Sequence, residues 1–144
     1  MTDDLAIPGE DGRPRLDHIG IAVKSLERGL QLYAAELGCE TSPAVEVAQE
    51  QVRVVMIRFG ETRIELLEAT SDDSPVGKFI ARRGEGIHHV AIKVKDLDAA
   101  VERLRASGRR LVTEAIQSPG ADGYRYIFVH PKSAGGVLLE LIEE

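Results

Sequence analysis

The sequence predicts an α+β fold made of two tandem βαβββ modules, because the chain carries one pattern twice. Residues 16–26 (LDHIGIAVKSL) return as residues 87–97 (IHHVAIKVKDL), and the matching histidines are 89 − 18 = 71 residues apart. A second echo closes each half: IELLE at 64–68 matches LELIE at 139–143, with an offset of 140 − 65 = 75. Between the two echoes, each half contains one helical pattern and further strand patterns, which gives the order β-α-β-β-β.

The first module is expected to span residues 15–69. Its opening strand alternates, so that His18 and Gly20 share one face while apolar residues occupy the other. Ser25 is placed to cap a helix that runs to Gly38. Three more strands are expected near residues 44–49, 52–59 and 62–68.

A linking helix is expected at residues 74–84, with Ser74 as its cap, Pro75 in its first turn and Gly84 as its end. The second module, residues 86–144, repeats the scheme. It is expected to contain a strand at 87–94, a helix from Asp96 to Gly108, and strands near 110–116, 124–130 and 137–143. Residues 1–14 are rich in glycine, proline and charge, which predicts a flexible tail and leaves 15–144 as a single domain.

Composition and charge exclude several functions. A chain of 144 residues with 43% hydrophobic residues can bury one core. Its net charge of −6, from 18 basic and 24 acidic residues, argues against nucleic acid or an anionic membrane as a partner. Cys39 is the only cysteine, and the sequence shows neither a secretory signal nor an apolar run long enough to span a bilayer. We therefore expect a cytoplasmic protein.

Strand parity selects a candidate metal site. His88 and His89 are adjacent and must point to opposite faces, and the repeat places His89 in register with His18. Glu65 and Glu140 stand between apolar residues on the closing strands, where an unpaired carboxylate costs free energy to bury. Considered alone, each residue is more simply explained by a structural role than by metal binding. Their recurrence as two matching pairs favours a divalent cation. A six-coordinate metal with four protein ligands keeps two positions for water or substrate, which suits Lewis-acid chemistry.

The chain resembles the methylmalonyl-CoA epimerase family of the vicinal oxygen chelate superfamily. The resemblance implies a curved, barrel-like mixed sheet around the metal, with His18, Glu65, His89 and Glu140 as its ligands. It implies one divalent metal, with Co²⁺ as the first choice and Mn²⁺, Zn²⁺, Ni²⁺ or Mg²⁺ as the others, and it also implies a homodimer. The segments that carry the resemblance are residues 16–23, 64–68, 73–75, 84–91 and 130–141.

This resemblance also implies the reaction. The family interconverts (2R)- and (2S)-methylmalonyl-CoA, between propionyl-CoA carboxylation and the cobalamin-dependent mutase, so the partner is a CoA thioester. A metal that stabilises the enolate and two groups that exchange the C2 proton would be needed. Glu140 is expected to be one of these groups. Some relatives use a glutamate on the third strand as the other, but this sequence has Val54 at that position.

Two other functions remain open at this stage. A glyoxalase-type lyase would act on a glutathione hemithioacetal with the same metal. A non-catalytic small-molecule-binding protein would need an apolar or aromatic groove, although the chain has only 4% aromatic residues and no tryptophan. An iron-dependent ring-cleaving dioxygenase fits less well, because it needs two histidines and a single carboxylate.

Overall fold

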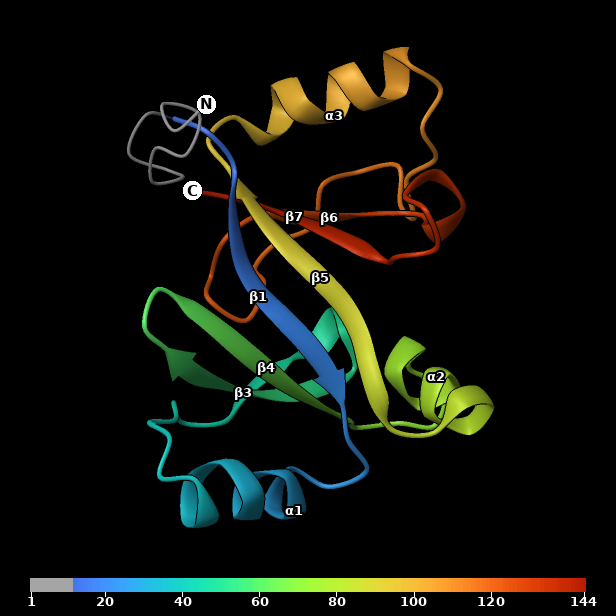
Figure 1. Ribbon diagram of the computed structural model, residues 1–144. Coiled ribbons are helices and arrows are strands. Elements are labelled where there is room, and N and C mark those ends of the chain that lie inside the picture. Colours follow the sequence, from blue (N-terminus) through green and yellow to red (C-terminus); the bar gives the residue numbers. More distant parts are fainter. Residues whose placement is uncertain (1–11) are drawn as a thin grey trace. The chain divides into compact units, whose positions relative to one another are not determined.

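The computed structural model describes residues 12–144, so most of the predicted N-terminal tail lies outside the described residues (Figure 1). In the described part, seven strands hydrogen-bond in the order β2-β3-β4-β1-β5-β7-β6 and form one mixed sheet, accompanied by three α-helices. The predicted α+β class is confirmed. The chain divides into two compact units, one formed by His18–His89 and one by the described part of Met1–Asp17 with Val90–Glu144. The module limits predicted from the sequence stay a prediction.

The unit of His18–His89 contains most of the first strand, β1, and all of β2, β3 and β4. Strands β1 and β4 pair in parallel, whereas β3 pairs antiparallel with both β4 and β2. Helix α1 is shorter than predicted, because after Leu30 the chain continues as a π-helix. On one face of the sheet, Leu26 of α1 packs with Ile57 and Leu66. The elements are β1 (Arg15–Ala22), α1 (Leu26–Leu30), the π-helix Gln31–Glu36, β2 (Val45–Val47), a 3₁₀ turn Ala48–Glu50, β3 (Val52–Phe59), β4 (Thr62–Ala69) and α2 (Pro75–Arg83).

The unit of Val90–Glu144 repeats the parallel pairing, since β5 pairs in parallel with β7 and β7 pairs antiparallel with β6. Leu97 and Val101 of α3 are buried with Ile127 and Leu141 of the sheet. Strand β5 starts in the other unit and enters this one at Val90. The elements are β5 (Gly86–Val94), α3 (Leu97–Ala106), β6 (Tyr126–Val129), a 3₁₀ turn Pro131–Ser133 and β7 (Leu139–Glu143).

The predicted strand at residues 110–116 is wrong. Its Leu111 forms only an isolated bridge with Val129, and the next bridge joins Gln117 to Tyr126. Between these bridges, side chains donate to two of the carbonyls. Arg105 donates to Glu114, and Thr113 and Gln117 donate to Ala115. Residues with strand propensity therefore make a loop, because side-chain bonds replace a continuous ladder.

The predicted helix caps are confirmed. Ser74 Oγ accepts a 2.9 Å hydrogen bond from the amide of Gly77, and Pro75 occupies the first turn of α2. The Asp96 carboxylate accepts from Ala99 at 3.0 Å and so begins α3. Each cap satisfies an amide that the helix leaves unpaired, which is worth about 1 kcal/mol.

The last glutamate of each repeated strand segment also accepts a hydrogen bond from the first residue of a helix, a role that the sequence did not reveal. Glu68, at the end of β4, accepts a 2.8 Å hydrogen bond from the amide of Leu26, the first residue of α1. Glu143, at the end of β7, accepts at 3.3 Å from Leu97, the first residue of α3. The offsets of 97 − 26 = 71 and 143 − 68 = 75 equal those of the two echoes. The repeat thus extends to the contacts that join strand and helix.

Candidate metal centre

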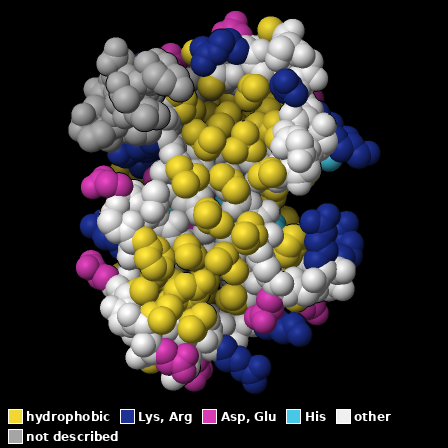
Figure 2. Space-filling model, viewed as in Figure 1, with side chains coloured by type: hydrophobic (Ala, Val, Ile, Leu, Met, Phe, Trp, Pro, Cys, Tyr) yellow, Lys and Arg dark blue, Asp and Glu magenta, His cyan; other side chains and the backbone are white. Residues whose placement is uncertain are grey.

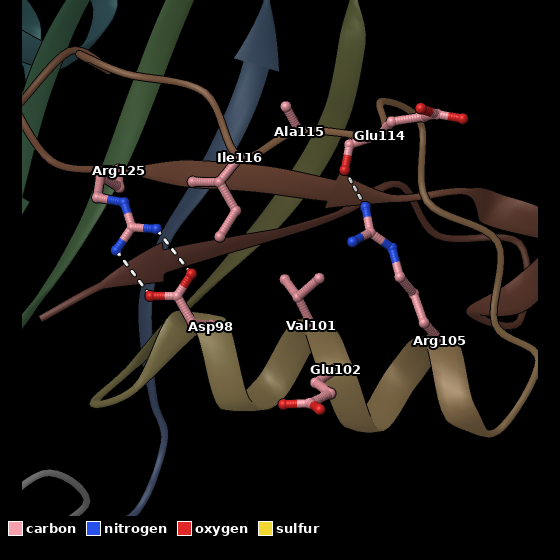
Figure 3. A pocket seen from close by; sticks show the side chains of 8 residues that line it. All are labelled: Asp98, Val101, Glu102, Arg105, Glu114, Ala115, Ile116 and Arg125. Atoms are coloured by element: carbon pink, nitrogen blue, oxygen red, sulfur yellow. Dashed lines mark hydrogen bonds and ion pairs between the residues drawn. The ribbon is translucent and has the colours of Figure 1, made fainter.

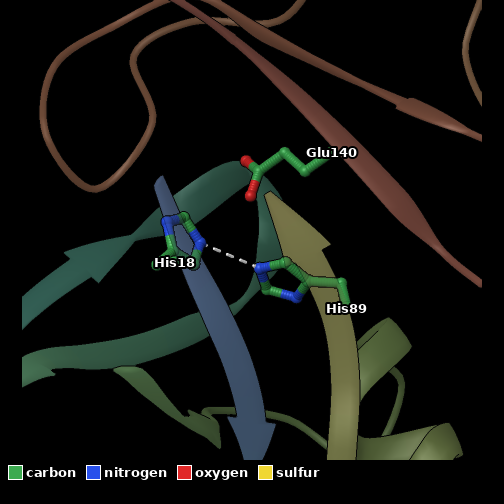
Figure 4. A group of neighbouring side chains, drawn as sticks. All are labelled: His18, His89 and Glu140. Carbon is green, nitrogen blue, oxygen red and sulfur yellow. Dashed lines mark hydrogen bonds between the residues drawn. The ribbon is translucent and has the colours of Figure 1, made fainter. Parts of the chain in front are cut away.

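Three of the predicted ligands come together in the unit of His18–His89. The Nε2 atoms of His18 and His89 lie 3.1 Å apart and face each other (Figure 4). Glu65 Oε1 lies 3.5 Å from Nε2 of His18 and 3.3 Å from Nε2 of His89. All three side chains are buried, with residue exposures of 2%, 6% and 2% for His18, Glu65 and His89. They form a compact triangle of one carboxylate oxygen and two imidazole nitrogens.

These separations suit a shared divalent cation. A first-row metal binds imidazole nitrogen and carboxylate oxygen at about 2.1 Å, so that neighbouring ligand atoms lie about 3.0–3.4 Å apart. The three measured separations, 3.1, 3.3 and 3.5 Å, are close to this range. A mixture of imidazole and carboxylate is also the donor set that such metals accept. The residues therefore fit a metal of this class.

The carboxylate of Glu65 is held in its charged form. Burial raises the pKa of Glu65, but hydrogen bonds and charge from His18 and His89 outweigh burial and lower it to about 2. A carboxylate that is ionised at neutral pH is ready to bind a cation.

His88 supports the ring of His89 rather than the triangle itself. The Nδ1 atoms of His88 and His89 lie 2.9 Å apart, so one ring nitrogen of His89 is engaged while its Nε2 faces His18 and Glu65. His88 in turn packs edge-on against Phe79 of α2, with ring centroids 5.1 Å apart. Such an outer partner fixes the tautomer and orientation of a ligating histidine.

Gly20 makes room for the imidazole of His89. A Cβ atom placed on Gly20 would collide with three atoms of that ring. The sequence showed only that Gly20 and Ala91 are both small residues two positions after a candidate histidine. The structure gives the reason at Gly20, where the absent side chain allows two histidines from different strands to bring their nitrogens together.

We expect Gly20→Ala to displace His89 and to weaken Co²⁺ affinity roughly 10- to 100-fold, as outer-shell changes do. Titration calorimetry with Co²⁺ measures this change. Gly29→Ala is the matched control: its Cβ would meet the end of the Leu66 side chain, away from the histidines, and so should cost stability but not affinity. Equal Co²⁺ affinities for Gly20→Ala and the unmodified protein would contradict the packing argument.

Glu140 occupies in its own half the register position that Glu65 has in the first. On β4, Glu65 lies opposite Gly20, two residues beyond His18. On β7, Glu140 lies opposite Ala91, two residues beyond His89. Both strand pairs are parallel, and Glu140, which projects from β7 in Figure 4, is 9% exposed. The two glutamates therefore occupy equivalent positions in two parallel strand pairs.

Strand β3 offers no proton-transfer group at position 54. Val54 is 2% exposed and lies opposite Leu67, which shares a face of β4 with Glu65. Its buried neighbours on that face of β3 are Val52 and Met56. The buried part of this face in the described strand β3 is therefore apolar.

A groove of about 590 Å³ lies between α3 and the loop before β6 (Figure 3). Hydrogen bonds with Asp98 raise the pKa of Arg125 and lower that of Asp98, and Arg105 is bonded to the carbonyl of Glu114. The guanidinium groups are thus already engaged, and three carboxylates, including Glu102, line the groove. It does not suit an anionic ligand, and we assign it no function.

The model of the Glyoxalase/Bleomycin resistance protein/Dioxygenase superfamily matches residues 17–128. The mitochondrial methylmalonyl-CoA epimerase of Homo sapiens is 40% identical over 128 residues, which cover 88% of this chain and 72% of the relative. The chain belongs to the methylmalonyl-CoA epimerase family of this superfamily.

Bacterial members of the family are 36% and 37% identical over most of their length. The ethylmalonyl-CoA/methylmalonyl-CoA epimerase of Cereibacter sphaeroides is 36% identical over 128 residues, which cover 88% of this chain and 96% of the relative. A variant of the Streptomyces coelicolor methylmalonyl-CoA epimerase, solved in complex with 2-nitronate-propionyl-CoA, has a TM-score of 0.85 and 37% identity. The match covers 90% of this chain and 96% of that one. The family predicted from sequence motifs is confirmed.

Proposed function

We propose that this protein is a metal-dependent methylmalonyl-CoA epimerase that interconverts the (2R) and (2S) thioesters. The observation that carries the proposal is the buried triangle of His18, Glu65 and His89, in a chain 40% identical to a named methylmalonyl-CoA epimerase. Relatives named as epimerases for methylmalonyl-CoA and ethylmalonyl-CoA support the substrate class. This evidence favours epimerisation over the glyoxalase-type and binding-only alternatives.

The proposed metal ligands are His18, Glu65, His89 and Glu140. The triangle supports the first three, and the equivalent register of Glu140 opposite Ala91 supports the fourth. We propose Co²⁺ as the metal, because imidazole and carboxylate donors suit first-row divalent ions. When bound, such an ion supplies Lewis-acid stabilisation of the negative charge that develops on the substrate oxygens.

We propose that Glu140 exchanges the C2 proton. The C2–H bond lies between a thioester and a carboxylate, so removing its proton leaves an electron pair that delocalises as an enolate. A buried carboxylate beside the substrate can accept this proton and later return one. Burial also keeps competing water away from the enolate.

We also propose a homodimer that acts in the cytoplasm, within propionate metabolism. Large hydrophobic side chains are exposed in both units, among them Leu37, Ile87 and Val112. Figure 2 shows hydrophobic side chains gathered on the visible surface of each unit, which favours association. Among residues 12–144, no helix combines the length and the apolar character needed to cross a membrane. Sedimentation equilibrium tests the dimer.

The test of the activity is solvent isotope exchange. The purified protein, loaded in turn with Co²⁺, Mn²⁺, Zn²⁺, Ni²⁺ or Mg²⁺, is incubated with (2S)-methylmalonyl-CoA in deuterium oxide. We expect deuterium at C2 together with formation of the (2R) thioester. If no metal supports exchange, or if methylglyoxal with glutathione is converted instead, the proposal is wrong.

A further inference from the structure

Among residues 12–144, the proposed mechanism leaves one pair of buried charged side chains unexplained. Lys93 of β5 and Asp17 of β1 are 9% and 7% exposed, and Nζ lies 3.5 Å from Oδ1. Both residues belong to the unit of Val90–Glu144. Burying an ion pair rarely adds stability compared with apolar residues of similar size. A buried lysine on a strand of the proposed site therefore points to a chemical role.

Lys93 shares a sheet face with Glu140. Alternation along β5 places Ala91 and Lys93 on the same face, and the partners of these two residues on β7 are Glu140 and Ile142. Lys93 is thus one strand across and two residues along from Glu140, which puts their Cα atoms about 8 Å apart. Two groups so spaced can flank one small reacting centre.

The ammonium of Lys93 has two attractive neighbours, one of which is exposed to solvent. Besides the Asp17 carboxylate, the ring of Tyr124 lies under Nζ, with 4.6 Å between Nζ and the ring centroid. Both the carboxylate and the π face attract a cation. Tyr124 itself is 44% exposed, so the lysine lies beside a side chain in contact with water. A proton given up by Lys93 can be replaced from that side.

Epimerisation requires a second proton-transfer group, and Val54 cannot provide one. We propose that Lys93 is this group and donates the proton to the face of C2 opposite Glu140. This inference rests on the proposed epimerase function.

The protons and electrons of the step balance. Glu140 takes the C2 proton, and the electrons of the broken C–H bond form the enolate. An N–H bond of Lys93 then breaks while a C–H bond forms on the other face, which leaves neutral Lys93 and protonated Glu140. Glu140 returns its proton to water and Lys93 regains one from water. In the reverse direction, neutral Lys93 takes the proton and protonated Glu140 donates it.

The test separates exchange from inversion in the Lys93→Met variant. The Co²⁺-loaded variant is incubated with each thioester separately in deuterium oxide, and both C2 deuterium and configuration are measured. We expect epimerisation to fall roughly 10²- to 10⁴-fold, the range of a lost acid–base group. The epimer whose C2–H faces Glu140 should still incorporate deuterium with retention, whereas the other epimer should not exchange. A merely structural role of Lys93 would slow both exchanges alike.

Two further variants and the unmodified protein serve as controls. Lys95→Met removes an exposed lysine directly after the same strand and should leave epimerisation unchanged. The double variant Lys93→Met/Asp17→Asn removes both charges of the buried ion pair together and should show the same one-sided exchange even if the single variant folds poorly. Epimerisation within threefold of the unmodified protein, or equal loss of both exchanges with Co²⁺ retained, would overturn the role of Lys93 alone. Absence of exchange in the unmodified protein would instead overturn the epimerase function, and with it this inference.

Discussion

Replacing His89 with alanine should abolish metal retention and leave the fold intact. The change removes the nitrogen that lies 3.1 Å from His18 and 3.3 Å from Glu65, so the triangle loses one corner. Removing one ligand should weaken Co²⁺ binding by more than the roughly 10- to 100-fold typical of outer-shell changes. Epimerisation should fall with the metal, because the negative charge of the enolate would lose its main stabilisation.

Elemental analysis after purification in metal-replete medium measures this directly, and circular dichroism reports the fold. His18→Ala should behave in the same way. The matched control is His88→Ala, which removes a neighbouring imidazole that contacts His89 but lies outside the triangle. Its expected loss of affinity is the smaller, roughly 10- to 100-fold effect of an outer partner. Full metal occupancy in His89→Ala would show that the ligand set is incorrect.

Much of the fold was predictable because each strand pattern and each helix cap is contained in a short segment of sequence. The two echoes, the caps Ser74 and Asp96, and the choice of His89 over His88 as the residue facing His18 follow from periodicity and side-chain chemistry. Residues 110–116 failed because strand propensity does not reveal whether a neighbouring backbone completes a ladder. That outcome depends on contacts with residues far along the chain.

The sequence nominates candidate donors for the site, but it does not reveal the residues that surround them. Gly20 appears in the sequence as a small residue, yet only the structure shows the ring of His89 in the space of its side chain. Nothing in the sequence separates Lys93 from the other four lysines, but the structure shows it buried against Asp17 and Tyr124. The sequence repeat identifies residues that recur in both halves. The importance of Gly20 and Lys93 lies in contacts that the repeat does not predict.

Glu140→Gln should separate proton transfer from metal binding. The amide keeps an oxygen that can bind the metal, but it cannot accept the C2 proton at neutral pH. We expect the kcat for epimerisation to fall roughly 10²- to 10⁴-fold, which corresponds to about 3–5 kcal/mol of activation free energy. KM and Co²⁺ content should change only a few-fold, because the carboxylate and the amide have nearly the same shape.

The repeat itself provides the matched control for this prediction. Glu65→Gln makes the same chemical change at the equivalent register position, opposite Gly20 instead of Ala91. Because Glu65 has a pKa of about 2, this variant also removes a full negative charge at neutral pH. If Glu65 serves only as a ligand, its variant should keep at least about a tenth of the activity, well above the level expected from a lost acid–base group. Equal losses in the two variants would show that the glutamates act alike, and that the symmetry of the metal site extends to proton transfer. A large loss confined to Glu140→Gln would show that the two modules share the metal and divide the chemistry.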